Sequence, residues 1–133
     1  MRWLTVIFFV TLIYSVSSQT VVNLDTLKLP LQTENVFNKA LFSDSLASSF
    51  CIIIKNEVKS HKHQYHSEHV YVMEGEAQMR LGEKIFKIKK GDLVFIPKNT
   101  IHAVKTTSKQ PLKVISIQAP IFDGKDRIII EEK

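Results

Sequence analysis

Four side chains in two separated stretches of the chain have the chemistry of metal ligands. The first stretch carries His61, His63 and Glu68, and the second carries His102. Imidazole nitrogens and carboxylate oxygens suit Fe(II), Mn(II), Ni(II), Cu(II) and Zn(II), and four such ligands leave up to two positions of an octahedral ion for water, dioxygen or a substrate. The residue types therefore predict one divalent transition metal ion per chain, with its identity open among these five. Because the imidazoles must be neutral to bind, the affinity is expected to fall below about pH 6.

Strand geometry sets conditions that these residues must meet to reach one ion. His61 and His63 are two residues apart, so both side chains point to the same face of an extended strand. Glu68 follows His63 by five residues, which is the wrong parity for one unbroken strand. We therefore expect residues 64–67 to bend or bulge, so that the carboxylate returns to the imidazoles. His102 has to arrive from a different strand.

Two further histidines lie in the first stretch. His66 would replace His63 as a ligand if the bend fell earlier in the chain, and this alternative stays open. His69 adjoins Glu68, so its side chain is expected on the opposite face of the strand. A His-x-His pair alone is common on exposed polar loops, and only the combination with the carboxylate and the remote histidine indicates a site.

The body of the chain has the pattern of an all-β domain. Runs rich in Val, Ile, Phe and Tyr alternate with turn residues, and no long stretch repeats at helical spacing. Gly82 is expected to form a tight hairpin turn. Several short strands in about 115 residues predict a jelly roll or small barrel. The expected strands are residues 49–56, 70–74, 77–81, 84–88, 93–96, 101–106 and 112–118. Residues 22–29 are expected to form either an edge strand or a packed arm.

The first 18 residues have the composition of a secretory signal peptide. Arg2 supplies a positive start, residues 3–14 are almost wholly apolar, and small residues precede Gln19. The apolar run of about 12 residues is shorter than the ~20 needed to span a bilayer. We expect a signal peptide at 1–18, an arm or edge strand at 19–47 and one β-barrel domain at 48–133. The mature chain is predicted to be secreted or periplasmic, with no membrane span.

Charge and cysteine content exclude two classes of protein. Without Arg2 the chain has 17 basic and 13 acidic residues, a net charge of about +4. The densest basic cluster lies at residues 84–90 and alternates with apolar residues, which indicates a solvated strand face and not a nucleic-acid site. Cys51 is the only cysteine, so an intramolecular disulfide is impossible. Its apolar neighbours favour a buried thiol that acts as a small hydrophobe.

The two stretches together resemble the motifs of a small single-domain cupin. The first motif of that family, Gly-x5-His-x-His-x(3,4)-Glu-x6-Gly, is matched by His61, His63, Glu68 and Gly75. The second, Gly-x5-Pro-x-Gly-x2-His-x3-Asn, is matched by Gly91, Pro97 and His102. Lys55, Asn99 and Thr106 depart from the two motifs, and Asn99 can adopt a left-handed turn almost as glycine does.

The resemblance covers about residues 48–119 and implies a fold, a metal and an assembly. It implies a conical β-barrel of the cupin jelly-roll type, with the metal near the open end and two copies forming a homodimer. The tail at residues 122–127 is similar to the ends of small bacterial cupins, and its Asp-Gly turn would lead into a last strand at residues 128–130. The motifs are informative about fold and metal and poor guides to the reaction.

Two functional hypotheses follow. The first is a metalloenzyme acting on a small organic molecule, with dioxygenase or isomerase-like chemistry. The second is a non-catalytic module that binds a small ligand or a sugar, so the sequence leaves enzymatic activity open. Ser116 and Gln118 share a strand face with Val114, and these polar groups are expected either to line the pocket or to face solvent.

Overall fold

The computed structural model describes residues 21–131, and the predicted signal peptide at 1–18 lies outside the described residues. Within them the chain forms ten strands and one short 3-10 helix, η1 (Leu24–Thr26). The strands are β1 (Val36–Ser43), β2 (Ser48–Ile54), β3 (Glu57–Lys62), β4 (Ser67–Glu74), β5 (Glu76–Leu81), β6 (Lys84–Lys89), β7 (Leu93–Ile96), β8 (His102–Thr106), β9 (Leu112–Ala119) and β10 (Ile128–Ile129).

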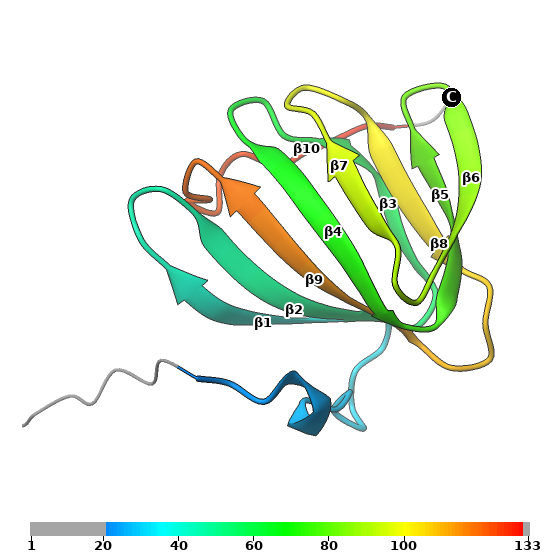
Figure 1. The fold of residues 1–133 in the computed structure, drawn as a ribbon. Coiled ribbons are helices and arrows are strands. Elements are labelled where there is room, and N and C mark those ends of the chain that lie inside the picture. The colour runs from blue at the N-terminus through cyan, green and yellow to red at the C-terminus, as the bar shows by residue number, and fades with distance from the viewer. Residues whose placement is uncertain (1–20, 132–133) are drawn as a thin grey trace, which may run out of the picture.

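The strands form two five-stranded antiparallel sheets that face each other (Figure 1). One sheet has the order β1-β2-β9-β4-β7, and the other has the order β10-β3-β8-β5-β6. β4 and β5 are consecutive in the chain but lie in different sheets, so the polypeptide crosses between the layers. The fold is therefore the all-β jelly roll that the strand pattern predicts.

Alternating burial along the strands builds the core between the two sheets. In β4 the side chains of Val70 and Val72 are buried, while those of His69 and Tyr71, which alternate with them, are exposed. The inward residues of both sheets form one apolar cluster. Burying each of these branched side chains contributes roughly 1.5–3 kcal/mol, which must offset the conformational entropy lost on folding.

Most expected strands are confirmed, but no strand was expected at β3, and the edge strand allowed within residues 19–47 lies at β1 and not at residues 22–29. β1 is an edge strand whose residues are mostly exposed, so it lacks a buried apolar face. β3 is rich in polar residues, and its pairing with β8 shifts register between Val58 and His61. Both strands are defined by their partners, and not by their own apolar pattern. Residues 22–29 form the packed arm, where the Leu24 carbonyl accepts a hydrogen bond of 2.7 Å from Lys113 Nζ.

Two other local expectations are confirmed. Asn99 has φ of +61°, so it takes the left-handed conformation at the position where the cupin motif has glycine. Its backbone N–H donates to the carbonyl of His63, which ties the loop between β7 and β8 to the end of β3. Cys51 is fully buried, and the lysines of β6 are exposed. No helix within residues 21–131 has the length and apolar character to cross a membrane.

Candidate metal centre

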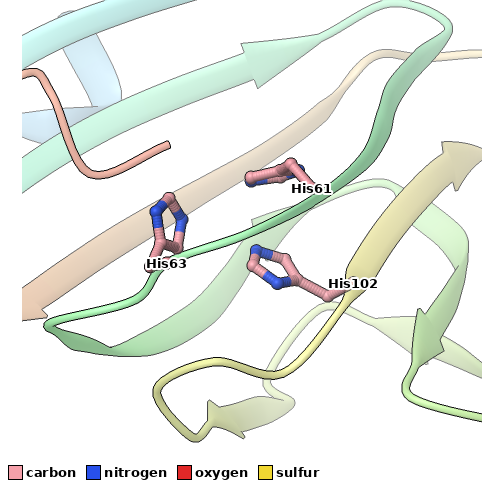
Figure 2. Close-up of side chains that lie close together, drawn as sticks. All are labelled: His61, His63 and His102. Carbon is pink, nitrogen blue, oxygen red and sulfur yellow. The ribbon is translucent and has the colours of Figure 1, made fainter. Parts of the chain in front are cut away.

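Three histidines from two adjacent strands converge between the sheets. His61 lies in β3, His63 follows the end of β3, and His102 begins β8 (Figure 2). One nitrogen of each ring lies within 4.8 Å of the others, and all three side chains are buried. In agreement with the spacing argument, the two histidines of the first stretch approach the same point and the third arrives from another strand.

Backbone register explains this convergence. His61 and His102 are directly opposite in the antiparallel pair β3 and β8, so their side chains leave the sheet on the same face. Their ring centroids are 4.1 Å apart. After His63 the chain bends at residues 64–65 and enters the other sheet as β4. The bend that the parity of Glu68 requires is therefore present within the expected segment.

Glu68 comes from the opposite sheet and lies beside two of the three imidazoles, those of His63 and His102. Its Oε2 is 3.5 Å from Nε2 of His63 and 3.5 Å from Nε2 of His102. Its Oε1 accepts a hydrogen bond from the Ser116 hydroxyl. Burial alone would raise the pKa of this carboxyl, but the neighbouring imidazoles of His102 and His63 and the hydrogen bond from Ser116 outweigh burial and lower the pKa. Glu68 is therefore a carboxylate at neutral pH.

The hydrogen bonds made by the Nδ1 atoms define the tautomers of the three histidines. Nδ1 of His61 is 2.8 Å from the Lys59 carbonyl, and Nδ1 of His102 is 3.0 Å from the Thr100 carbonyl. Nδ1 of His63 is 2.8 Å from the carbonyl of Asp126. A carbonyl oxygen only accepts, so each Nδ1 carries the proton and each neutral ring keeps a lone pair on Nε2. This is the arrangement found in most metal-binding histidines.

The donor set fits one transition metal ion. Two ligands of one ion lie at most about 4.2 Å apart, because each bond is roughly 2.1 Å long. The three nitrogens therefore need to move inward by less than about 1 Å to share an ion. Nε2 of His102 is also buried without a hydrogen-bond partner among the described residues. Buried polar atoms in native proteins are rarely left unsatisfied, so a cation is the natural partner for this lone pair.

The pKa values of the candidate ligands His61 and His63 are shifted in opposite directions. Burial and the nearby His102 lower the pKa of His61 to about 3, so this ring is neutral. Burial would also lower the pKa of His63, but its hydrogen bond and charge interaction with Glu68 and its contacts with Asp126 raise it. Of the rings with a resolved shift, His63 is therefore the one that carries a proton most readily when no cation neutralises Glu68.

His66, the alternative ligand, belongs to a neighbouring cluster. Its Nδ1 is 2.9 Å from Oδ2 of Asp126, and its ring centroid is 4.1 Å from that of His63. His63, His66 and Asp126 form a second group of potential ligand atoms. The Asp126 carboxylate, however, already accepts backbone N–H bonds from Gln64, Tyr65 and His66, at 2.8, 2.8 and 3.2 Å. These bonds assign Asp126 to holding the turn. His63, and not His66, belongs to the group of potential ligand atoms that contains His61 and His102. His69 is exposed, as expected.

We expect Asp126→Asn to destabilise the domain. Asparagine has one carbonyl oxygen, so it cannot accept all of the N–H groups that the carboxylate accepts, and a buried donor left unpaired costs about 1–3 kcal/mol. A thermal unfolding scan should show a melting temperature lower by several degrees, since each kcal/mol is roughly 4 °C here. Asp123→Asn is the matched control, because Asp123 is exposed and accepts from Lys125 N. Equal shifts in the two variants would contradict this role.

A cavity of about 150 Å³ adjoins the histidines and Glu68. Its walls are mainly apolar and include Ile52, Val70, Met79 and Phe122. Gln118 also lines the cavity, and its Nε2 donates a 3.2 Å hydrogen bond to the buried Ser116 hydroxyl. Of the two alternatives for Ser116 and Gln118, the structure therefore shows that these polar groups face inward. The arrangement places the four candidate ligands at the wall of a small, mainly apolar cavity.

Two residues of the site were not assigned a role from the sequence. Asp126 holds the turn before Glu68 and orients His63, and Arg127 lines the cavity. Both follow the Asp-Gly turn at residues 123–124, which the sequence marked as the approach to the last strand. Their function depends on where that strand pairs. β10 pairs with β3, with Ile128 opposite Lys62 and Ile129 opposite His61.

Comparisons with known proteins agree with this architecture. Mannose-1-phosphate guanylyltransferase RfbM of Salmonella typhimurium is 37% identical over 81 residues, which are 59% of this chain and 17% of that protein. A Klebsiella pneumoniae protein with a double-stranded β-helix domain superposes with a TM-score of 0.73 and 18% identity, over 86% of this chain and 100% of that one. PAC13 of Streptomyces, solved with uridine, gives a TM-score of 0.66 and 16% identity over 74% and 81% of the two chains.

These similarities support conclusions of different scope. The chain spans a small fraction of the guanylyltransferase, so the similarity concerns one domain of that enzyme. The two solved structures share the fold at low sequence identity. The family model for the cupin domain matches residues 50–118, which are more than half of the chain and run from within β2 to within β9. The two motifs, the jelly roll and this match together establish that the chain belongs to the cupin family.

Proposed function

We propose that this cupin binds one divalent transition metal ion through His61, His63, Glu68 and His102, and a small organic molecule in the adjacent cavity. The observation that carries the proposal is the direction of the lone pairs. Three carbonyls hold the Nδ1 protons, so three Nε2 lone pairs are available beside one buried carboxylate. Fe, Mn, Ni, Cu and Zn remain the candidate metals, because all accept this set of ligands.

The first candidate function is a metalloenzyme with dioxygenase or isomerase-like chemistry on a small organic molecule. A bound divalent ion supplies Lewis acidity toward an oxygen substituent of the substrate. The protein supplies a small, mainly apolar pocket that orients the bound molecule beside the ion. Ser116 donates to Glu68 and holds the carboxylate in place beside His63 and His102.

A non-catalytic binding module is the second candidate, and the composition of the cavity wall favours it. Among the described residues that line the cavity, Arg127 is the only ionisable group besides the four proposed ligands. Arginine does not exchange its proton at physiological pH, so it cannot serve as a general acid or base. An enzyme would then have to use Glu68 or a group on the substrate for proton transfer.

Two measurements on the purified mature chain separate these functions. Elemental analysis reports how much metal is bound and which metal it is. A turnover screen against small oxygen-containing and carbonyl substrates then reports catalysis by the loaded protein. One ion per chain with turnover supports the enzyme, and one ion per chain without turnover supports the binding module. A wild-type protein that binds none of the five metals would refute the proposed site.

We also propose that the chain is exported and forms a homodimer. Export rests on the signal-like residues 1–18, and N-terminal sequencing of the mature protein should begin at Gln19. The dimer is supported by exposed apolar side chains on the outer face of the β1-β2-β9-β4-β7 sheet. Leu93 lies opposite Tyr71 in the β4 and β7 pair, and Phe95 lies opposite His69. An exposed apolar patch of this kind favours pairing with a second copy of the chain.

We expect sedimentation of the mature chain to give twice the monomer mass, and Leu93→Lys to shift it toward the monomer. Leu93 is 64% exposed in one chain, and a charge buried in an apolar interface without a partner is strongly unfavourable. Ile85→Lys is the matched control, because Ile85 is 63% exposed but lies in the other sheet. A wild-type chain that sediments as a monomer would contradict the dimer.

A further inference from the structure

Arg127 lines the cavity and offers it a positive charge that no described residue pairs with. The residue lines the cavity, and its guanidinium has no hydrogen bond or ion pair with the described residues. Its side chain is nevertheless close enough to the site for its charge to act there, since Arg127 lowers the pKa of His61 and Glu68 acts on the pKa of Arg127. The donors of this arginine are therefore available to a bound molecule.

The backbone around Arg127 is held from both sides. On one side the Asp126 carboxylate accepts N–H groups of the turn between β3 and β4, and the Asp126 carbonyl holds His63. On the other side β10 pairs with β3, and the N–H of Ile130 donates to the Ser60 carbonyl at 2.9 Å. The C-terminal segment thus crosses from the β9 sheet to the edge of β3 (Figure 1). The backbone at Arg127 is therefore anchored, and its side chain is exposed to solvent where it lines the cavity.

The remaining wall limits what Arg127 can bind. The cavity of about 150 Å³ is lined mainly by Ile, Val, Leu, Met and Phe side chains. An apolar protein cavity of roughly that volume accommodates a molecule the size of benzene. The ligand should therefore combine an anionic group for the guanidinium with an apolar body of about six carbon atoms. A planar carboxylate matches the fork of guanidinium donors.

The charge balance favours an anion when the metal is bound. Glu68 and Arg127 are the charged residues of opposite sign along the wall, and they cancel while the imidazoles are neutral. A divalent cation then leaves a surplus of two positive charges in a small, mainly apolar space. A monocarboxylate reduces this surplus, so metal and acid should each increase the affinity for the other.

We propose that Arg127 is the specificity-determining residue of this pocket and selects small monocarboxylic acids with an apolar body. The inference rests on the proposed metal and small-molecule site and names the class of its ligand. Arg127 binds the carboxylate, and the apolar wall accommodates the carbon skeleton. Neutral molecules of the same shape bind more weakly, because they leave the guanidinium and the surplus charge uncompensated.

Isothermal titration calorimetry of the metal-loaded protein tests this assignment. The probes are benzoate and butyrate, each compared with its neutral amide, benzamide or butyramide. We expect the acids to bind about tenfold to a hundredfold more tightly than the amides, which is the usual difference for a hydrogen bond to a charged group. Arg127→Ala should abolish this preference, and Arg127→Lys should restore only part of it, since lysine lacks the planar fork. Chelation of the metal should also weaken acid binding to the wild type.

Lys125→Ala is the matched control for the change in charge. Lys125 is exposed, lies two residues before Arg127 and is not part of the cavity wall, so this variant should keep the preference for acids. Amides that bind the wild type as tightly as acids, or equal losses in Arg127→Ala and Lys125→Ala, would overturn the assignment. Elemental analysis of each protein distinguishes a failure of the Arg127 assignment from a failure of the proposed function. A metal-loaded wild type that ignores the acids refutes only the role of Arg127, whereas a wild type without metal refutes the proposed function.

Discussion

His102→Ala is expected to reduce bound metal well below one ion per chain and to lower the melting temperature. The variant removes the only proposed ligand from β8 and leaves Glu68 without one of its two imidazole partners. A ligand present at 100 times its dissociation constant stabilises the folded state by about 2.7 kcal/mol. Loss of that contribution corresponds to roughly 10 °C in a domain of this size. Elemental analysis and thermal unfolding measure the two effects, and His61→Ala should behave similarly.

His69→Ala is the control for this prediction. His69 is exposed on the outer face of β4 and contacts Phe95 with ring centroids 4.9 Å apart, so its removal should leave metal content and melting temperature close to wild type. Repeating the scans after chelation separates metal binding from packing. If the metal causes the stabilisation, chelation should reduce the difference between wild type and His102→Ala. Equal metal content in the wild type and His102→Ala would contradict the site.

Gly75→Ala is expected to give the second large effect, this time on folding stability alone. Gly75 joins β4 to β5 with φ of +82°, and a Cβ there would lie 2.8 Å from the Pro111 carbonyl oxygen and 3.0 Å from Leu112 Cα. The left-handed conformation costs alanine roughly 1–2 kcal/mol, and overpacking against backbone adds about 1–3 kcal/mol. The melting temperature should therefore fall by about 10 °C in a thermal scan.

Gly82→Ala separates the two causes of this effect. Gly82 also has a positive φ of +59°, but a Cβ there would meet nothing within 4 Å. Its substitution should therefore cost only the conformational part, about 1–2 kcal/mol. Equal melting temperatures for the two variants would show that the contact with the Pro111 segment does not matter.

Local pattern was sufficient to predict most of the fold. β7 was predicted with its observed bounds because Leu93–Ile96 is a short apolar run between two turns. Asn99 was expected to take a left-handed turn because few other residues tolerate it, and its φ is positive. β3 was missed because it is rich in polar residues, among them the proposed ligand His61. These residues remove the alternating apolar pattern by which a strand is predicted.

The amino-acid sequence by itself determined the identity and parity of the four proposed ligands, the family motifs and the all-β pattern, since these depend on residue types and on spacings of a few positions. The tertiary structure alone decided how the ligands are held and what lies beside them. The partner of His63 Nδ1 is the carbonyl of Asp126, 63 residues away. Arg127 reaches the cavity because β10 pairs with β3. Contacts at such separation depend on chain topology and strand register, which no local spacing encodes.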